Sequence, residues 1–273
     1  MLESKRFHEG GIDFIYQKPS QKRLIRLTRF SVRGYIPSLK PRLRGCVWAY
    51  ESQLERDFLY ILDHDPHCVD LQTQPLQIRY LTKNGKEAVA TPDIWAVFRD
   101  KKEVIFEIKP EERLKDLIKD ENWQFKVAAI KEYCAKAGYE YQIITEMKIN
   151  SVRLQTIKNL LGAAKHFSIQ QGIALAPNFD EKLTEILENN KITLGNLVGK
   201  VVEKTKIDPS TAISWIKYYI YFGKLGINWN FGLDSTEISL ESHSGLVPAY
   251  SILEEFFEDI PKCRSEEHTS ELQ

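Results

Sequence analysis

Hydrophobic residues recur first at helical and then at strand spacing along this chain. Residues 50–62, YESQLERDFLYIL, predict an amphipathic helix that ends at the breaker Pro66. Its apolar positions are Leu54, Phe58, Ile61 and Leu62. Residues 69–81 predict a strand that is interrupted at Pro75, and Asn84-Gly85 predicts the turn that follows it.

A hairpin, a long helix and a short strand come next. Residues 90–114, ATPDIWAVFRDKKEVIFEIKPEERL, read as two strand arms around a short polar loop. Residues 120–138 predict a helix that stops at Gly138, and residues 139–146 predict a last strand. Helix, strands, helix and strand in this order favour an α/β unit with a mixed sheet.

The pattern becomes helical from about Ser151 onward. The predicted helices cover residues 151–167, 179–190, 193–207 and 208–226. Asp208 suits the N-cap of the last helix because Pro209 follows it at the first helical position. Gly223 or Gly226 suits its end. Residues 227–240 alternate weakly and predict a small hairpin, so this half indicates a winged-helix-like domain.

Three charged residues stand among the apolar residues of the 90–114 hairpin: Asp93, Glu107 and Lys109. Alternate side chains of a strand share a face, so Glu107 and Lys109 point the same way as Ile105. A loop of odd length brings Asp93 to that face too. If residues 100–102 form the loop, Asp93 lies opposite Lys109 and Glu107 is its diagonal neighbour.

Carboxylates placed in this way repel each other, and a divalent cation between them removes the conflict. Mg²⁺ prefers oxygen ligands, usually one or two carboxylates with water and phosphate oxygens. Lys109 would orient or deprotonate a water and stabilise charge on a phosphate. Glu55 heads the apolar stripe of the first helix and is a further candidate ligand. These parts suit metal-dependent phosphodiester hydrolysis. The alternatives are a surface salt bridge and, for Glu55, an ordinary exposed residue.

Charge is balanced over the whole chain and uneven along it. There are 38 Lys and Arg against 38 Asp and Glu, so the formal net charge is zero, which argues against a generic basic nucleic-acid binder. Residues 17–44 nevertheless hold nine Lys or Arg and no acidic residue. This run predicts a phosphate-facing arm, with Arg42 and Arg44 as DNA contacts; the alternative is a solvated basic surface.

Other features narrow the class of protein. No apolar run approaches the ~20 residues of a membrane helix, and the N-terminus lacks the core of a signal peptide, so we expect a cytoplasmic protein. The four cysteines form no C-x-x-C pair, which predicts reduced thiols. The segment HDPHC, residues 64–68, predicts a turn at a helix end. The last ten residues, RSEEHTSELQ, look like a translated sequencing adapter, so we expect them to lie outside the fold.

Four motifs follow one another between residues 46 and 114. They are S-x-L-E ending at Glu55, Gln74-Pro75, Pro92-Asp93 and Glu107-Ile108-Lys109-Pro110. Together they resemble the TnsA endonuclease subunit of heteromeric cut-and-paste transposons, over roughly residues 30–160. The PD…ExK string alone is a weak signal, and the other three motifs raise its specificity. The resemblance implies an α/β fold: a restriction-endonuclease-like PD-(D/E)xK mixed-sheet core with a helical, winged-helix-like C-terminal domain.

The same resemblance implies roles for individual residues. Glu55, Asp93 and Lys109 would hold the catalytic positions, together with Glu107. Glu107 stands where most nucleases of the fold have Glu and TnsA can have Gln, with the main chain assisting the metal. The implied metal ligands are therefore Glu55, Asp93, Glu107 and the Ile108 carbonyl. Mg²⁺ is the implied cofactor, with Mn²⁺ as a substitute.

The sequence patterns and the resemblance together predict a division of the chain into four segments. They are a basic N-terminal arm at 1–45, the endonuclease domain at 46–165, the winged-helix-like domain at 166–263 and a non-native tail at 264–273. Within the C-terminal domain, residues 210–222 hold many aromatic residues and one basic residue, Lys217. This composition favours core plus a protein interface over a helix that reads DNA. The aromatic residues are Trp215, Tyr218, Tyr219, Tyr221 and Phe222.

The implied function is an endonuclease subunit that nicks the 5′ ends of a transposon. Its substrate would be double-stranded transposon-end DNA. A DDE transposase (TnsB-like) would process the 3′ ends, and an AAA+ ATPase (TnsC-like) would regulate the assembly. Transposons of the CRISPR-associated kind are included in this expectation. The alternatives are a restriction or repair nuclease of the same fold, and an assembly subunit whose nuclease site has decayed.

Overall fold

The computed structural model describes residues 6–9, 12–15, 32–40, 43, 45–149, 151–169, 179–188 and 191–240. The predictions for Arg42, Arg44 and the tail at 264–273 concern residues outside these ranges. The strands are β1 (Arg6–Glu9), β2 (Ile12–Ile15), β3 (Gly34–Pro37), β4 (Val47–Tyr50), β5 (Cys68–Thr73), β6 (Ile78–Leu81), β7 (Glu87–Ala90), β8 (Ile94–Phe98), β9 (Glu103–Ile108), β10 (Glu140–Ile144), β11 (Ile192–Thr193) and β12 (Glu237–Ile238). The helices are α1 (Gln53–His64), α2 (Glu111–Leu117), α3 (Glu121–Ala137), α4 (Ser151–Ile169), α5 (Phe179–Leu187), α6 (Leu194–Thr205) and α7 (Pro209–Tyr221), with a 3₁₀ turn η2 (Glu146–Lys148).

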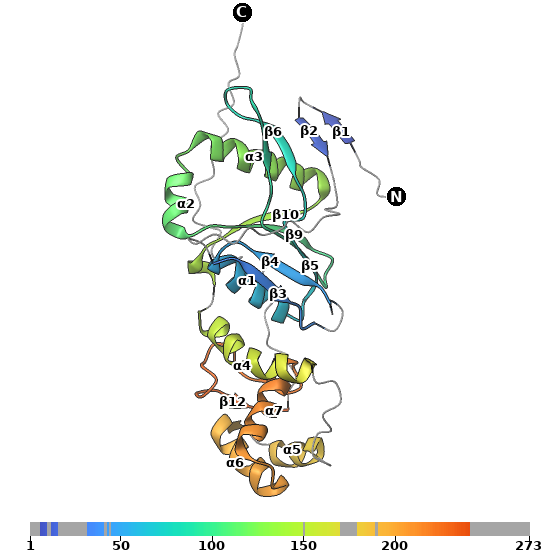
Figure 1. Ribbon diagram of the computed structural model, residues 1–273, viewed down its shortest axis with the longest axis vertical. Helices are drawn as coiled ribbons and strands as arrows, with labels where there is room; N and C mark the ends of the chain where they lie inside the picture. Colours follow the sequence, from blue (N-terminus) through green and yellow to red (C-terminus); the bar gives the residue numbers. More distant parts are fainter. Residues whose placement is uncertain are drawn as a thin grey trace, which may run out of the picture.

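A four-stranded sheet of order β10-β9-β8-β5 lies at the centre of the first half (Figure 1). β5, β8 and β9 pair antiparallel, whereas β9 and β10 pair parallel. Parallel neighbours need a crossover connection, and α2 and α3 supply it. The prediction of a mixed sheet is confirmed. The strand predicted over residues 69–81 is broken at Pro75 into β5 and β6, and the Asn84-Gly85 turn joins β6 to β7.

β9 separates two layers of hydrophobic core because its successive side chains point to opposite faces. Val104, Phe106 and Ile108 belong to the layer that contains α1, and the ring of Phe58 packs edge-on at 5.0 Å from that of Phe106. Ile105 belongs to the other layer with Ile130 of α3. The predicted alternation along this strand is therefore confirmed. Charged residues that follow Ile105 on its face, at 107 and 109, point to the side that α3 covers.

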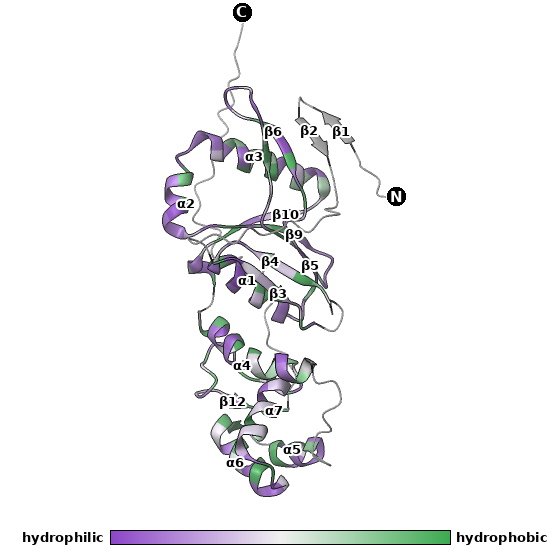
Figure 2. Ribbon diagram, in the orientation of Figure 1, coloured by the Kyte–Doolittle hydropathy of each residue, from purple (hydrophilic) through white to green (hydrophobic). Residues whose placement is uncertain are grey.

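The helix ends obey the rules that the sequence suggested. Asp120 caps α3 by accepting a hydrogen bond from the Asn122 N–H, and Gly138 ends this helix at φ 76°. The carboxylate of Asp208 accepts a hydrogen bond from the Thr211 N–H at the start of α7. Helix α2 has no buried residue, and Figure 2 shows it as almost wholly hydrophilic.

The second half consists of α4 to α7 and the short β11–β12 pair. The hairpin predicted at 227–240 is only partly present, because its strand β12 pairs with β11 and only Gly226 and Ser239 bridge across the segment. The winged-helix-like assignment stays a prediction, as do the domain boundaries. The one at residue 165 falls inside α4.

Most of the aromatic side chains in the range 210–222 lie in the core, which confirms the core part of the prediction, whereas the protein interface stays a prediction. Trp215 is 4% exposed, and Tyr219 and Tyr221 are also buried. The ring of Phe179 packs edge-on at 4.7 Å from that of Trp215. A surface role is left only to the half-buried Tyr218 and Phe222. A run of aromatic residues on a helix is equally expected in a core, and here the core holds most of them.

The two halves are packed together at the C-terminal end of α1. The buried His64 ring lies 5.0 Å from the Tyr221 ring and 4.6 Å from the Trp229 ring. The Lys158 ammonium of α4 lies 2.9 Å from Oδ1 of Asp57 in α1. Within the part of the chain that is described, no helix is long and apolar enough to cross a membrane. The thiols of the described cysteines, Cys46, Cys68 and Cys134, are free.

Candidate active site

The register of the β8–β9 hairpin brings Asp93 and Glu107 closer than we expected. Val97 pairs with Glu103 and Ile94 with Phe106. The loop is one residue earlier than predicted, because the Phe98 N–H donates to Lys102 O at 2.9 Å. Its length stays odd, so the predicted face is right. The prediction that Asp93 lies opposite Lys109 is wrong: continuing the observed register places Asp93 opposite Glu107.

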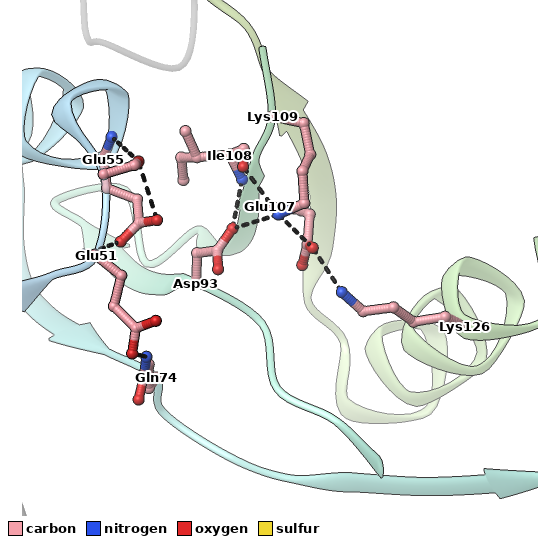
Figure 3. Close-up of polar contacts among 9 residues, drawn as sticks. Glu51, Glu55, Gln74, Asp93, Glu107, Ile108, Lys109 and Lys126 are labelled. Carbon is pink, nitrogen blue, oxygen red and sulfur yellow. Dashed lines mark hydrogen bonds and ion pairs between the residues drawn. The ribbon is translucent and has the colours of Figure 1, made fainter. Parts of the chain in front are cut away.

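Asp93 stands at the entry to β8 and is held by the end of β9 (Figure 3). Its Oδ2 accepts a hydrogen bond from the Ile108 N–H at 2.7 Å and lies 3.2 Å from Nζ of Lys109. The same ammonium lies 2.8 Å from Oε1 of Glu107 and donates to the Ile108 carbonyl at 2.9 Å. Lys109 thus contacts three of the four predicted metal ligands.

Glu55 reaches the site from α1 but is held by its own helix end. Ser52 is the N-cap and accepts a hydrogen bond from the Glu55 N–H at 3.1 Å. The Glu55 carboxylate in turn accepts from the Ser52 hydroxyl at 3.1 Å and from the Glu51 N–H at 2.7 Å. This reciprocal arrangement resembles a capping box. Figure 3 shows the Glu55 and Asp93 carboxylates on facing elements without a direct bond between them.

Two residues of the site were missed from the sequence, Lys126 and Trp123 of α3. The Lys126 ammonium lies 2.6 Å from Oε1 of Glu107, an ion pair to a carboxylate whose residue has 0% exposure. The Trp123 ring lies beneath both lysines, with its centroid 4.8 Å from Nζ of Lys126 and 5.8 Å from Nζ of Lys109. Lys126 and Glu107 are 19 positions apart, so no local spacing pointed to their contact.

Burial and mutual repulsion perturb the ionisation of the site. Burial, reinforced by the charge of Glu107 and opposed by Lys109, raises the pKa of Asp93 from 3.8 to about 7. Burial also raises the pKa of Glu55, although hydrogen bonds from Glu51 and Ser52 oppose it. Burial alone would lower the pKa of Lys109, but the adjacent carboxylates outweigh it and the pKa lies above its usual value.

The donor atoms fit a divalent cation in kind, though not as a ready-made cage. In the described ranges, no group of three or more His, Cys, Asp or Glu is arranged to hold a metal ion. The ammonium of Lys109 lies among the predicted ligand oxygens. Each carboxylate nevertheless keeps an oxygen that takes no hydrogen bond from the described residues, Oδ1 of Asp93 and the buried Oε2 of Glu107. The ligand roles stay predictions.

Two described members of the basic run face protein groups instead of open solvent. Nζ of Lys40 donates to the Asp65 carbonyl at 2.7 Å and also to the Cys68 carbonyl. The Arg33 guanidinium lies 3.7 Å from the Glu51 carboxylate. Lys40 therefore fastens the chain before β4 to the turn after α1, so the phosphate-facing role does not extend to it. The HDPHC segment forms the predicted turn, in which the His67 N–H donates to Oδ1 of Asp65 at 2.8 Å.

Comparison with protein families adds an independent finding. Residues 65–146 match the family model described as TnsA-like endonuclease N terminal. This chain carries a TnsA-like endonuclease domain. Comparison with curated proteins gave no match. The TnsA-like endonuclease match spans β5 to β10, and the mixed sheet of that segment fits an endonuclease core.

The TnsA-like endonuclease segment contains most of the site. Asp93, Glu107, Lys109 and Lys126 all lie within it, whereas Glu55 lies ten positions before it, on α1. The charged cluster on β8, β9 and α3 therefore lies inside the matched segment, and Glu55 lies outside it. The catalytic roles of these residues stay predictions.

Proposed function

We propose that this chain is the Mg²⁺-dependent endonuclease subunit of a Tn7-type cut-and-paste transposon and nicks DNA at the 5′ ends of the element. The observation that carries the proposal is the convergence of Asp93, Glu107 and Lys109 at one edge of the sheet, inside the segment that matches TnsA-like endonucleases. Mn²⁺ would substitute for Mg²⁺. Glu55 faces this edge from α1.

The residues supply the positioning and charge that phosphodiester hydrolysis needs. When bound, a divalent cation would activate water and stabilise the developing negative charge, with Asp93, Glu107, Glu55 and the Ile108 carbonyl as its ligands. The Lys109 ammonium is held between two carboxylates and keeps its proton at neutral pH, since its pKa is raised. It is thus suited to bind a phosphate oxygen and to stabilise the charge that develops there.

The partners belong to the same proposal. A DDE transposase would process the 3′ ends and bring transposon-end DNA to this chain, and an AAA+ ATPase would regulate the assembly. Net charge is zero, and sequence-independent affinity for DNA scales with the phosphates that basic residues neutralise, so the chain alone has little of it. We therefore expect weak nicking without the transposase. A winged-helix-like C-terminal half would then mainly serve the assembly.

The test uses a DNA duplex that carries the transposon end, together with the cognate transposase. The two strands are labelled separately, so that nicking at the 5′ end of the element is distinguished from nicking at its 3′ end. We expect nicking of the 5′ strand with Mg²⁺, none with EDTA, and DNA binding without turnover with Ca²⁺. Asp93→Asn and Lys109→Ala should abolish nicking, with metal binding largely retained in the second variant. The control is Asp100→Asn, which is the same Asp-to-Asn substitution in the loop at the other end of the β8–β9 hairpin.

Three outcomes would contradict the proposal. Nicking at normal rates by Asp93→Asn or Lys109→Ala would place the chemistry elsewhere. Efficient, end-specific nicking by the purified chain without the transposase would favour a restriction or repair nuclease of the same fold. Absence of nicking under every condition, with the fold intact, would favour the decayed assembly subunit.

A further inference from the structure

Glu107 has more cationic partners than a single buried carboxylate needs. Its Oε1 contacts the Lys109 ammonium at 2.8 Å and the Lys126 ammonium at 2.6 Å. One well-placed lysine already compensates a buried carboxylate. A second ammonium on the same oxygen repels the first, so the pair is held at some cost. A role in stability alone does not account for this arrangement.

Lys126 is held by a residue of its own helix as well as by Glu107. It lies near the start of α3, and the Trp123 ring, one turn earlier on the same helix, contacts its ammonium by a cation–π interaction at 4.8 Å. Ile130 of α3 and Ile105 of β9 belong to the same buried cluster, so core packing sets the distance between this helix and this strand. Lys126 therefore stays on Glu107 even if Lys109 moves toward a phosphate.

Lys126 changes the charge balance of the site. Glu55, Asp93 and Glu107 contribute three negative charges if all are ionised, and the two lysines offset two of them. With Lys109 and Lys126 both on its Oε1, Glu107 is a weaker donor to a divalent cation even through its unbonded Oε2, since two nearby ammonium groups repel a cation that approaches this carboxylate. The same contact keeps the Glu107 carboxylate turned toward Lys109.

We propose that Lys126 is a positioning residue that holds Glu107 as the orienting partner of Lys109 and withholds it from the metal. The inference rests on the proposed nuclease function and changes one assignment in it, because it removes Glu107 from the ligands of the cation. Asp93 remains a ligand, and Glu107 instead orients Lys109. Removing Lys126 frees Glu107 for the metal and leaves Lys109 less well placed. Metal binding then strengthens while nicking weakens.

The test measures Ca²⁺ binding by calorimetry in the DNA-free chain, so that it does not depend on turnover. Lys126→Met keeps the apolar stem against Trp123 and removes the charge. We expect it to bind Ca²⁺ about tenfold more tightly than the unchanged chain, a difference of about 1.4 kcal/mol. In the Glu107→Gln background the same change should alter affinity less than twofold, because Lys126 acts through Glu107. Lys126→Arg should restore the original affinity.

Controls separate this inference from a loss of fold and from the proposed function. Lys131→Met, at an exposed position of the same helix, should leave affinity and nicking unchanged. Circular dichroism melts check the fold, and Lys126→Gln replaces Lys126→Met if the latter does not fold. With the transposase and saturating Mg²⁺, Lys126→Met should nick at least tenfold more slowly.

Unchanged or weaker Ca²⁺ affinity in folded Lys126→Met would overturn the positioning role, even if the unchanged chain nicks DNA as proposed. An equal gain in the Glu107→Gln background would also overturn it, since Lys126 would then act on the cation without Glu107. If the unchanged chain fails to nick, the nuclease proposal falls, and the calorimetric cycle still decides whether Lys126 controls Glu107.

Discussion

Replacing Asp93 by Asn should stabilise the metal-free chain, and the gain should grow with pH. The Asp93 carboxyl is buried beside Glu107, which raises its pKa from 3.8 to about 7. A carboxyl whose pKa is raised by folding is more easily protonated in the folded chain than in the unfolded chain. Its contribution to stability is therefore complete below pH 3.8 and is lost as the pH rises toward 7.

The size of the effect follows from that shift. Roughly three pH units at about 1.4 kcal/mol each give an upper limit of about 4 kcal/mol above pH 7. The Asp93 side chain is 19% exposed and keeps some hydration, and the variant loses the ion pair with Lys109. We therefore expect about half of the limit, ~2 kcal/mol, at pH 8. The Asn side-chain oxygen can still accept the Ile108 N–H.

Thermal melts with EDTA at pH 5 and pH 8 measure this gain without metal. At pH 8, Asp93→Asn should melt roughly 4–8 °C above the unchanged chain, and at pH 5 by less than half as much. Asp100→Asn, in the exposed loop of the same hairpin, should show no such pH-dependent gain. A variant that melts lower at both pH values, or by the same margin at both, would refute the reasoning.

Two further predictions concern the second half and the end of the chain. Trp215→Ala should lower the free energy of unfolding, measured in urea, by about 3–5 kcal/mol because the ring is buried against Phe179. A loss below about 1 kcal/mol would show that the Trp215 ring is not buried in the core. The exposed Phe231→Ser is its control. A chain that ends at Cys263 should match the full chain in melting temperature and nicking, and a loss of several degrees would show that residues 264–273 contribute to the fold.

The hairpin shows how far periodicity determines a site. Alternation along β9 predicted that Glu107 and Lys109 share the face of Ile105, and the structure confirms it. The predicted cross-strand partner of Asp93 was wrong, because the residue opposite Asp93 depends on where the loop begins. Either placement of an odd loop preserves the face, so the sequence pattern does not distinguish Glu107 from Lys109 as the residue opposite Asp93.

Contacts between distant elements account for what the sequence could not provide. Lys126 reads as one more charged position on an amphipathic helix until α3 docks on β9 and brings it to Glu107. The basic run of residues 17–44 likewise reads as an arm. Its member Lys40 is used inside the fold, because backbone carbonyls at the end of α1 and the start of β5 accept its hydrogen bonds. The sequence shows that a residue is charged, but it does not show which group that charge contacts in the folded chain.

The paired lysines also bear on the proposed dependence on partners. The Lys109 ammonium contacts Asp93 and Glu107, and the Lys126 ammonium contacts Glu107, so the two lysines offset part of the negative charge of the carboxylates. A phosphate that reaches Lys109 competes with those carboxylates for its ammonium. As the lysine turns to the phosphate, Asp93 loses a cationic neighbour and becomes a better ligand for a divalent cation. Binding of DNA and of metal would then strengthen each other, since such coupling is reciprocal. A site of this kind suits an endonuclease that stays inactive until another subunit delivers the DNA end.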